Sequence, residues 1–238
     1  MRKTLLIAQR ELAGFFVSPM AYVIGALLML ACNFAFFQTI FIPGKEATLR
    51  PLFEAMAYLM IVAVPLLTMK LVSEEFNSGT IEALMTAPVT DTQVILGKYL
   101  GVAGFYLAML GVTLVPIILM AIFSTPDWGI VIMGYVGMVL LGGAYLAVGL
   151  FASTTSRYQL VAAIVGGALL GVFVFGPKTL VAYGPAPANT LAAQMDVMGY
   201  FQDFARGMLD TRGVVFFASL TGVFLFLSIK LLESRRWR

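Results

Sequence analysis

Uncharged apolar runs of about 20 residues are the feature that most limits how this chain can fold. Of its 238 residues, 61% are hydrophobic and 11% are charged, and the mean hydropathy is +0.95. Soluble domains contain about 25% charged residues. Because runs of this length cross a bilayer as helices, the sequence predicts an all-α, polytopic membrane protein.

Six transmembrane helices are predicted, in a single transmembrane domain that covers residues 1–238. The predicted spans are residues 20–41, 52–72, 96–123, 128–152, 158–175 and 214–232. The second and sixth spans reach full length only if Glu54, Lys70 and Lys230 extend their charged groups to the membrane surfaces.

The distribution of Lys and Arg predicts the orientation of these spans. With an even number of spans, both termini share one side of the membrane with the segment of residues 73–95. That side holds ten basic residues and the other side holds five, from a total of 15. Because cytoplasmic loops are enriched in Lys and Arg, we expect both termini to be cytoplasmic.

Two further segments are predicted to be helical without spanning. In residues 1–18, Leu5, Ala8 and Leu12 recur at helical spacing among charged residues, which indicates an amphipathic helix lying in the inner membrane surface. A frayed terminus is the alternative. In residues 176–213, a proline-rich break precedes apolar residues at helical spacing, which predicts an external helical segment that lies on the outer leaflet or dips into it.

Composition argues against several kinds of chemistry. The chain has no His, which is the commonest metal ligand and general base, and it has one Cys. No Gly-x-x-x-x-Gly-Lys-Ser/Thr motif occurs, so no phosphate-binding loop is visible. The basic residues lie at span ends, which does not suggest nucleic acid. We therefore expect no catalytic residues, no metal and no cofactor on this chain.

Few polar side chains lie within the predicted spans. Asn33 and Gln38 of the first span either hydrogen-bond to neighbouring helices or line a translocation path. An ion-coupled carrier needs ionisable groups at membrane depth, and the middles of these spans have almost none. A carrier or channel that works alone is therefore disfavoured.

The segment of residues 73–95 is charged and lies on the predicted cytoplasmic side. Gly79 breaks the helix that leaves the second span, and Pro88 ends the short helix predicted over residues 80–86. Thr90 and Gln93 fit a capping box that starts the next helix. The predicted short helix has an apolar face formed by Ile81, Leu84 and Met85. It is either part of a solvated connection or a lever, through which a bound protein transmits force to two spans.

Four stretches resemble permease subunits of type II ATP-binding cassette (ABC) exporters. SEEFNSGTIEALMTAPVTDTQVILGKYL (73–100) is similar to the family's coupling-helix region, and QRELAGFFVSPMAYV (9–23) to its N-terminal elbow helix. FARGMLDTRGVVFFASL (204–220) and LESRRW (232–237) resemble the two ends of the last span in the gliding-motility-type branch.

The resemblance implies a half-transporter in the bacterial cytoplasmic (inner) membrane. Two six-span subunits pair as a homodimer or heterodimer, and two separate ABC ATPase subunits, which carry the ATP and Mg, bind below them. An envelope or accessory protein is a further expected partner besides the lipid bilayer. The residues that fall on the family's coupling motif are Glu74, Glu75, Gly79, Thr80, Glu82 and Pro88.

The expected function is therefore that of a non-catalytic subunit of an ATP-driven exporter. ATPase coupling is expected from the motif residues together with Ile81, Leu84 and Met85. The alternative is a mechanical or scaffold subunit, which acts on an envelope partner and moves no solute. The apolar spans favour a lipid-like or amphipathic cargo over a highly charged ion.

Overall fold

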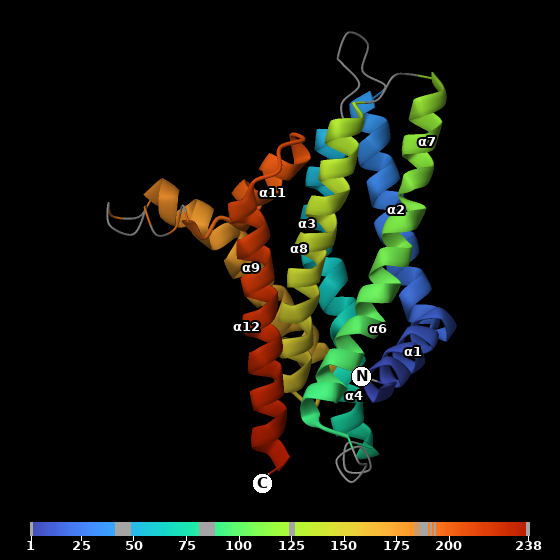
Figure 1. Ribbon diagram of the computed structural model, residues 1–238, viewed down its shortest axis with the longest axis vertical. Coiled ribbons are helices and arrows are strands. Elements are labelled where there is room, and N and C mark those ends of the chain that lie inside the picture. The colour runs from blue at the N-terminus through green and yellow to red at the C-terminus, as the bar shows by residue number, and fades with distance from the viewer. Residues whose placement is uncertain are drawn as a thin grey trace.

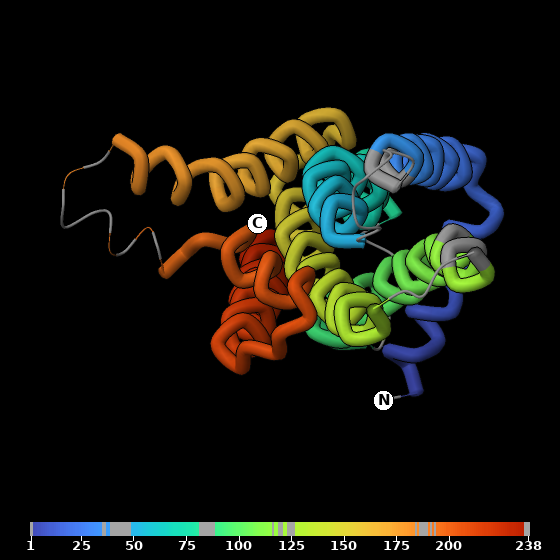
Figure 2. Tube along the Cα trace, turned by 90° about the horizontal axis from the view of Figure 1, so that it is seen from above, coloured from blue at the N-terminus to red at the C-terminus, as the bar shows by residue number. Residues whose placement is uncertain are grey.

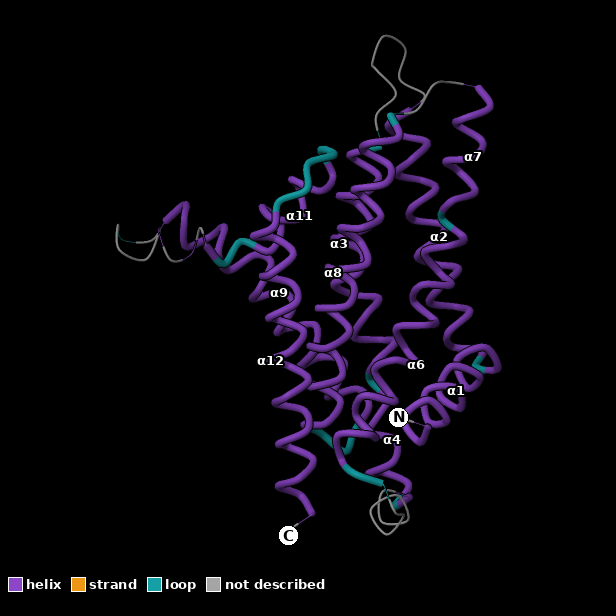
Figure 3. Tube along the Cα trace, in the orientation of Figure 1, coloured by secondary structure: helices purple, strands orange, loops and turns teal. Residues whose placement is uncertain are grey.

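Helices form almost all of the regular structure (Figures 1 and 3). A computed structural model describes residues 2–40, 49–80, 89–123, 127–183, 185, 190, 192 and 194–236, and no β-strand occurs among them. The helices are α1 (Arg2–Val17), α2 (Pro19–Ile40), α3 (Arg50–Thr68), α4 (Lys70–Ser78), α6 (Asp91–Val112), α7 (Leu114–Phe123), α8 (Trp128–Thr155), α9 (Gln159–Tyr183), α11 (Val197–Ala205) and α12 (Thr211–Arg236).

Five helical stretches in the described residues are long and apolar enough to cross a membrane. The pair α1 and α2, bent by 71°, makes six when it is counted as one span. The predicted spans correspond in order to α2, α3 with α4, α6 with α7, α8, α9 and α12. The prediction of an all-α, polytopic membrane protein is thus confirmed.

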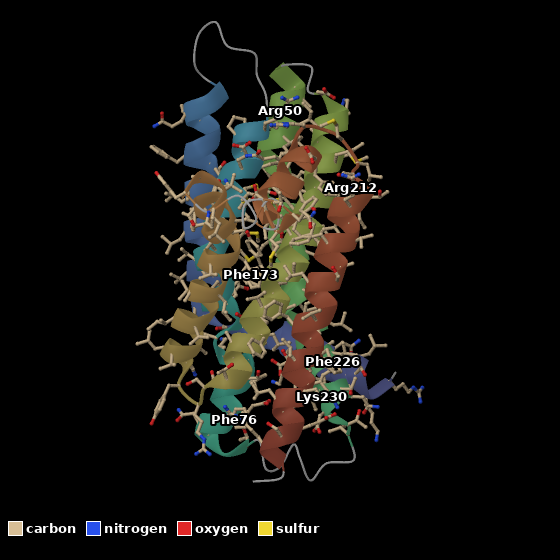
Figure 4. The ribbon with its side chains drawn as sticks, turned by 90° about the vertical axis from the view of Figure 1, so that its left-hand side faces the viewer. Arg50, Phe76, Phe173, Arg212, Phe226 and Lys230 are labelled. Carbon is tan, nitrogen blue, oxygen red and sulfur yellow. The ribbon has the colours of Figure 1, made fainter. Side chains whose placement is uncertain are left out.

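Figure 4 shows which residues lie near each of the two ends of the helical bundle. Arg50 and Arg212 lie near one end, whereas Phe76 and Lys230 lie near the other, which is also the end of the C-terminus and of α4 (Figures 1 and 4). Helix α1 and the C-terminal end of α12 both lie in the lower part of Figure 1, which agrees with an even number of crossings between them.

Helix α8 is the centre of the bundle (Figure 2). It contacts α3, α4, α6, α9, α11 and α12, and its residues from Ala144 to Val148 are at most 1% exposed. Small residues allow this close packing. A Cβ atom at Gly137 would lie 2.6 Å from Cβ of Phe204, so the α11 backbone approaches α8 only because Gly137 has no side chain.

The bend between α1 and α2 turns the chain from the bundle's side into its first span. Ser18 lies outside both helices, and its backbone N–H donates to the carbonyl of Phe15 at 3.2 Å. Pro19 is the first residue of α2, where its missing N–H costs no helical hydrogen bond. A proline at this position therefore favours a new helix in a new direction.

The third predicted span begins as expected but is interrupted. The Thr90 hydroxyl accepts from the Gln93 N–H at 3.3 Å and the Gln93 side chain accepts from the Thr90 N–H, which confirms the capping box. The chain leaves the helix at Thr113 and resumes as α7, with Pro116 in its first turn. Pro116 has no N–H to bond to the preceding turn, so a break at this point costs little.

Helix α9 is longer than predicted. The predicted span ended at Phe175, before Pro177, but the helix continues through Pro177 to Tyr183. Its last part projects sideways from the bundle (Figures 1 and 2). A proline removes one helical hydrogen bond, and within apolar surroundings continued helix still satisfies more backbone groups than a loop would. The external segment predicted to start at residue 176 therefore begins as helix.

The external helix packs on protein and not only on lipid. Asp196 caps α11, since its carboxylate accepts from the Met198 N–H at 3.1 Å. Met198, Phe201 and Phe204 are at most 1% exposed and face α8 and its neighbours. The apolar face of α11 therefore packs on α8, which has the small residues that receive it, and whether this segment lies on the outer leaflet or dips into it stays a prediction.

A buried hydroxyl holds the joint between α3 and α4. Met69, between the two helices, offers no side-chain cap to α4. The Ser153 hydroxyl of α8 accepts from the N–H groups of Val72 and Ser73 at 3.0 and 3.2 Å, and donates to the Met69 carbonyl at 2.9 Å. One side chain thus satisfies three backbone groups of the joint.

Replacing this hydroxyl tests its role. We expect Ser153→Ala to lower the free energy of unfolding by about 1–3 kcal/mol, because buried backbone groups lose their partner. Thermal unfolding in detergent measures the effect. The matched control is Ser219→Ala, whose exposed hydroxyl bonds only to its own helix at Phe216. Equal shifts of the two melting temperatures would contradict the assignment.

Candidate functional site

Helix α1 lies directly on α6, at the end of the bundle that holds α4. Two glycines of α6 make this possible. A Cβ at Gly97 would lie 2.7 Å from Cβ of Ile7, and one at Gly101 would lie 2.6 Å from Cβ of Glu11. Because neither glycine has a side chain, the α1 backbone reaches α6 and carries Glu11 with it.

This approach creates an ionic cluster of three helices. The ammonium group of Lys98 (α6) lies 2.9 Å from Oε1 of Glu11 (α1) and 2.8 Å from Oε1 of Glu75 (α4). The Lys98 side chain is 2% exposed, and those of Glu11 and Glu75 are 19% and 13% exposed. A buried cation is stable only with such partners. The cluster therefore holds α1, α4 and α6 together.

A second lysine fastens α4 to the bend after α1. The Lys70 ammonium, at the start of α4, donates to the Ser18 hydroxyl at 2.7 Å and lies 5.7 Å from the centre of the Phe15 ring. The Phe15 ring in turn stacks on Phe105 of α6 at 5.2 Å. Helix α4 is thus attached near both ends to the helix that precedes the first span.

The last helix also reaches α4. The guanidinium carbon of Arg235 lies 4.6 Å from the centre of the Phe76 ring, a cation–π geometry, and Arg235 donates to the Thr155 carbonyl at the end of α8. Together with Ser153, this contact connects α4 to α8 and α12. Side chains from α1, α6, α8 and α12 therefore all converge on α4.

A groove separates α1 from α4 beside the ionic cluster. Its volume is about 310 Å³, and it contains both basic and acidic groups. Oε2 of Glu75 is buried and has no hydrogen-bond partner among the described residues, so this region keeps one unused acceptor. The groove is lined by Arg10, Glu11, Gly14, Phe15, Lys70, Leu71, Glu74, Glu75, Ser78, Thr80 and Lys98.

Comparison with known families agrees with this architecture. The chain matches the model of the ABC-2 family transporter protein over residues 21–233, which is most of its length. The chain belongs to the ABC-2 transporter family. It is thus a multi-pass membrane permease component of an ABC transporter. A comparison with curated proteins found no match.

Some predicted coupling residues of the permease lie beside the cluster. Glu74 is exposed next to half-buried Glu75, and Thr80 is exposed at the end of the groove. Gly79 ends α4 with φ at +73°, a conformation that side chains disfavour, so it supplies the expected helix break. Outside the described residues lie Ile81, Glu82, Leu84, Met85 and Pro88. A role for any of them in ATPase coupling stays a prediction.

The polar residues of the first span lie elsewhere. Asn33 is exposed and donates to the carbonyl of Met29 in its own helix at 2.8 Å, and Gln38 is exposed too. In the isolated permease, Asn33 does not hydrogen-bond to a neighbouring helix among the described residues. Whether these side chains line a path stays a prediction.

Sequence reasoning missed Lys98 as the centre of the site. As a basic residue at the end of a predicted span, Lys98 was expected only to contribute to the orientation of the helices. The available signal was a lysine between two glycines four residues apart, which marks a close helix contact. Ser153 and Arg235 gave no such signal, because their partners lie about 80 residues away.

We expect Lys98→Met to destabilise the permease by about 3–5 kcal/mol, because two half-buried carboxylates lose their cation. Hydrogen exchange should rise first in α1 and α4. Lys230→Met is the matched control, since Lys230 is 56% exposed and its partners among the described residues, Glu233 and the Phe226 ring, belong to its own helix. Thermal unfolding with hydrogen exchange measures both variants. Similar behaviour of the two would show that the cluster does not hold these helices.

Proposed function

We propose that this permease couples ATP hydrolysis by a separate ATPase subunit to the movement of substrate across the bacterial cytoplasmic membrane, with both termini and α4 on the cytoplasmic side. The observation that carries the proposal is the convergence of four helices on α4. A segment that only connects two spans has no need of such attachment.

The contacts provide a route from α4 into the bundle. A displacement of α4 is transmitted to α1 through Glu75, Lys98 and Glu11, since the buried ion pairs resist separation. It is transmitted to α8 through Ser153 and to α12 through Arg235. Force applied beyond Gly79 therefore acts on several spans at once.

The partners follow from family membership. An ABC-2 permease implies an ABC ATPase partner, and such permeases often dimerise. We assign ATP and Mg to the ATPase, and no catalytic role to this chain. Its placement in the gliding-motility-type branch rests on the resemblance of residues 204–220 and 232–237 and is part of the proposal.

A double substitution tests the docking surface. We expect Ile81→Asp with Leu84→Asp to abolish copurification of the ATPase in detergent, because two charges replace the predicted apolar face. The matched control is Met208→Asp with Leu209→Asp. These residues are 52% and 57% exposed and lie between α11 and α12, near the end of the bundle opposite α4. Unchanged copurification of the first variant would refute the coupling role of this segment.

The mechanical alternative has one observation in its favour. The turn at Gly207 exposes Met208 and Leu209, which an envelope protein can contact. If the permease is such a mechanical subunit, we expect the envelope partner to stimulate ATP hydrolysis in reconstituted vesicles while no solute is transported. If a transported substrate stimulates ATP hydrolysis without an envelope partner, the result supports the exporter function instead.

A further inference from the structure

A cationic side chain lies at membrane depth near the outer half of the bundle. On α3 and α4, Arg50 and Lys70 are 20 residues apart, about 30 Å along the helix, which matches the hydrocarbon thickness. Tyr58 lies about 12 Å inward from Arg50 by the same measure. Lys178 of α9 reaches this level, because its ammonium donates to the Tyr58 hydroxyl at 2.7 Å.

The local packing holds Lys178 at this depth. Its ammonium lies 5.4 Å from the centre of the Tyr58 ring, and Tyr58 stacks on Phe175 with ring centres 6.1 Å apart. Lys178 is half-buried. A lysine that only snorkels extends its ammonium toward the headgroups. Here it turns to an aromatic residue of the neighbouring helix.

The site has more hydrogen-bond donors than acceptors. Lys178 forms no ion pair with a carboxylate among the described residues. Its ammonium has three N–H donors, of which Tyr58 accepts one, and the Tyr58 O–H has no acceptor in the described part of the chain. Glu54 lies one helical turn outward from Tyr58 but is not in contact with Lys178. An uncompensated charge at this depth marks a functional site.

We propose that Lys178 and Tyr58 bind the anionic headgroup of an amphiphile. The ammonium and the phenol donate to one phosphate or carboxylate group, and the alkyl chains lie on the apolar face of α9 next to them. Val172 and Phe175 on this face are 68% and 49% exposed. The inference rests on the proposed function, for which it names the substrate class.

Lipid quenching on the permease alone tests this site. In a W128F, W237F background, Phe175→Trp places the reporter beside Tyr58. Vesicles contain phosphatidylcholine with either brominated phosphatidylglycerol or brominated phosphatidylcholine. We expect brominated phosphatidylglycerol to quench the tryptophan fluorescence roughly tenfold more effectively than brominated phosphatidylcholine, because hydrogen bonds to charged groups are stronger than those between neutral groups. Equal quenching by the two lipids would overturn the proposal.

Variants identify the groups responsible. Lys178→Gln should reduce the preference to about one, Lys178→Arg should keep it, and Tyr58→Phe should lower it in part, because each donor contributes. Lys230→Gln is the matched control and should keep the full preference, because Lys230 lies near the end of the bundle that holds Phe76 (Figure 4). A preference that survives Lys178→Gln refutes the site.

Two further measurements identify which negatively charged group neutralises Lys178. Inorganic phosphate should not compete, and competition would mean that a water-soluble anion binds instead. Glu54→Gln should increase the preference, because a negative charge nearby is removed. A preference that appears only in this variant would show that Glu54 neutralises Lys178, and the proposal would fail. None of these measurements needs the ATPase, so their failure is separate from failure of the coupling test.

Discussion

The ammonium group of Lys98 sets the arrangement of the cytoplasmic end of the permease. A charge that is 2% exposed at the base of an apolar bundle must keep its carboxylate partners, and these come from α1 and α4. Both helices therefore have to stay against α6. Gly97 and Gly101 make that distance attainable, so the ionic contact and the close helix contact depend on each other.

The same end of the molecule combines a rigid centre with polar attachments. Helix α8 is buried on all sides from Ala144 to Val148, whereas α4 is attached to its neighbours by a few directed contacts with Lys98, Ser153 and Arg235. Apolar packing tolerates small sliding, but a buried charge or a shared hydroxyl resists separation because the lost partner is not replaced by water. Movement of α4 is therefore passed on to other helices.

Structural features that depend only on neighbouring residues in the sequence could be predicted. The helix break at Gly79 and the Thr90 capping box depend on neighbouring residues, and both appear in the structure. The partners of Lys98 could not be predicted, because Glu11 is 87 residues away and only helix packing brings it near. Pro177 misled the prediction of α9 for a related reason: its local effect is to end a helix, but the bundle and membrane favour continuation.

Lys98 and Lys178 show how differently one charge can be accommodated. Lys98 has carboxylates from its own chain, so its charge is used to join helices. Lys178 has a phenol, which orients the ammonium without neutralising it. Since a charge without a carboxylate partner at membrane depth is costly, a counter-charge from outside the described chain would stabilise the second arrangement. A membrane supplies that counter-charge most readily on an amphiphile, whose tails also cover the exposed face of α9.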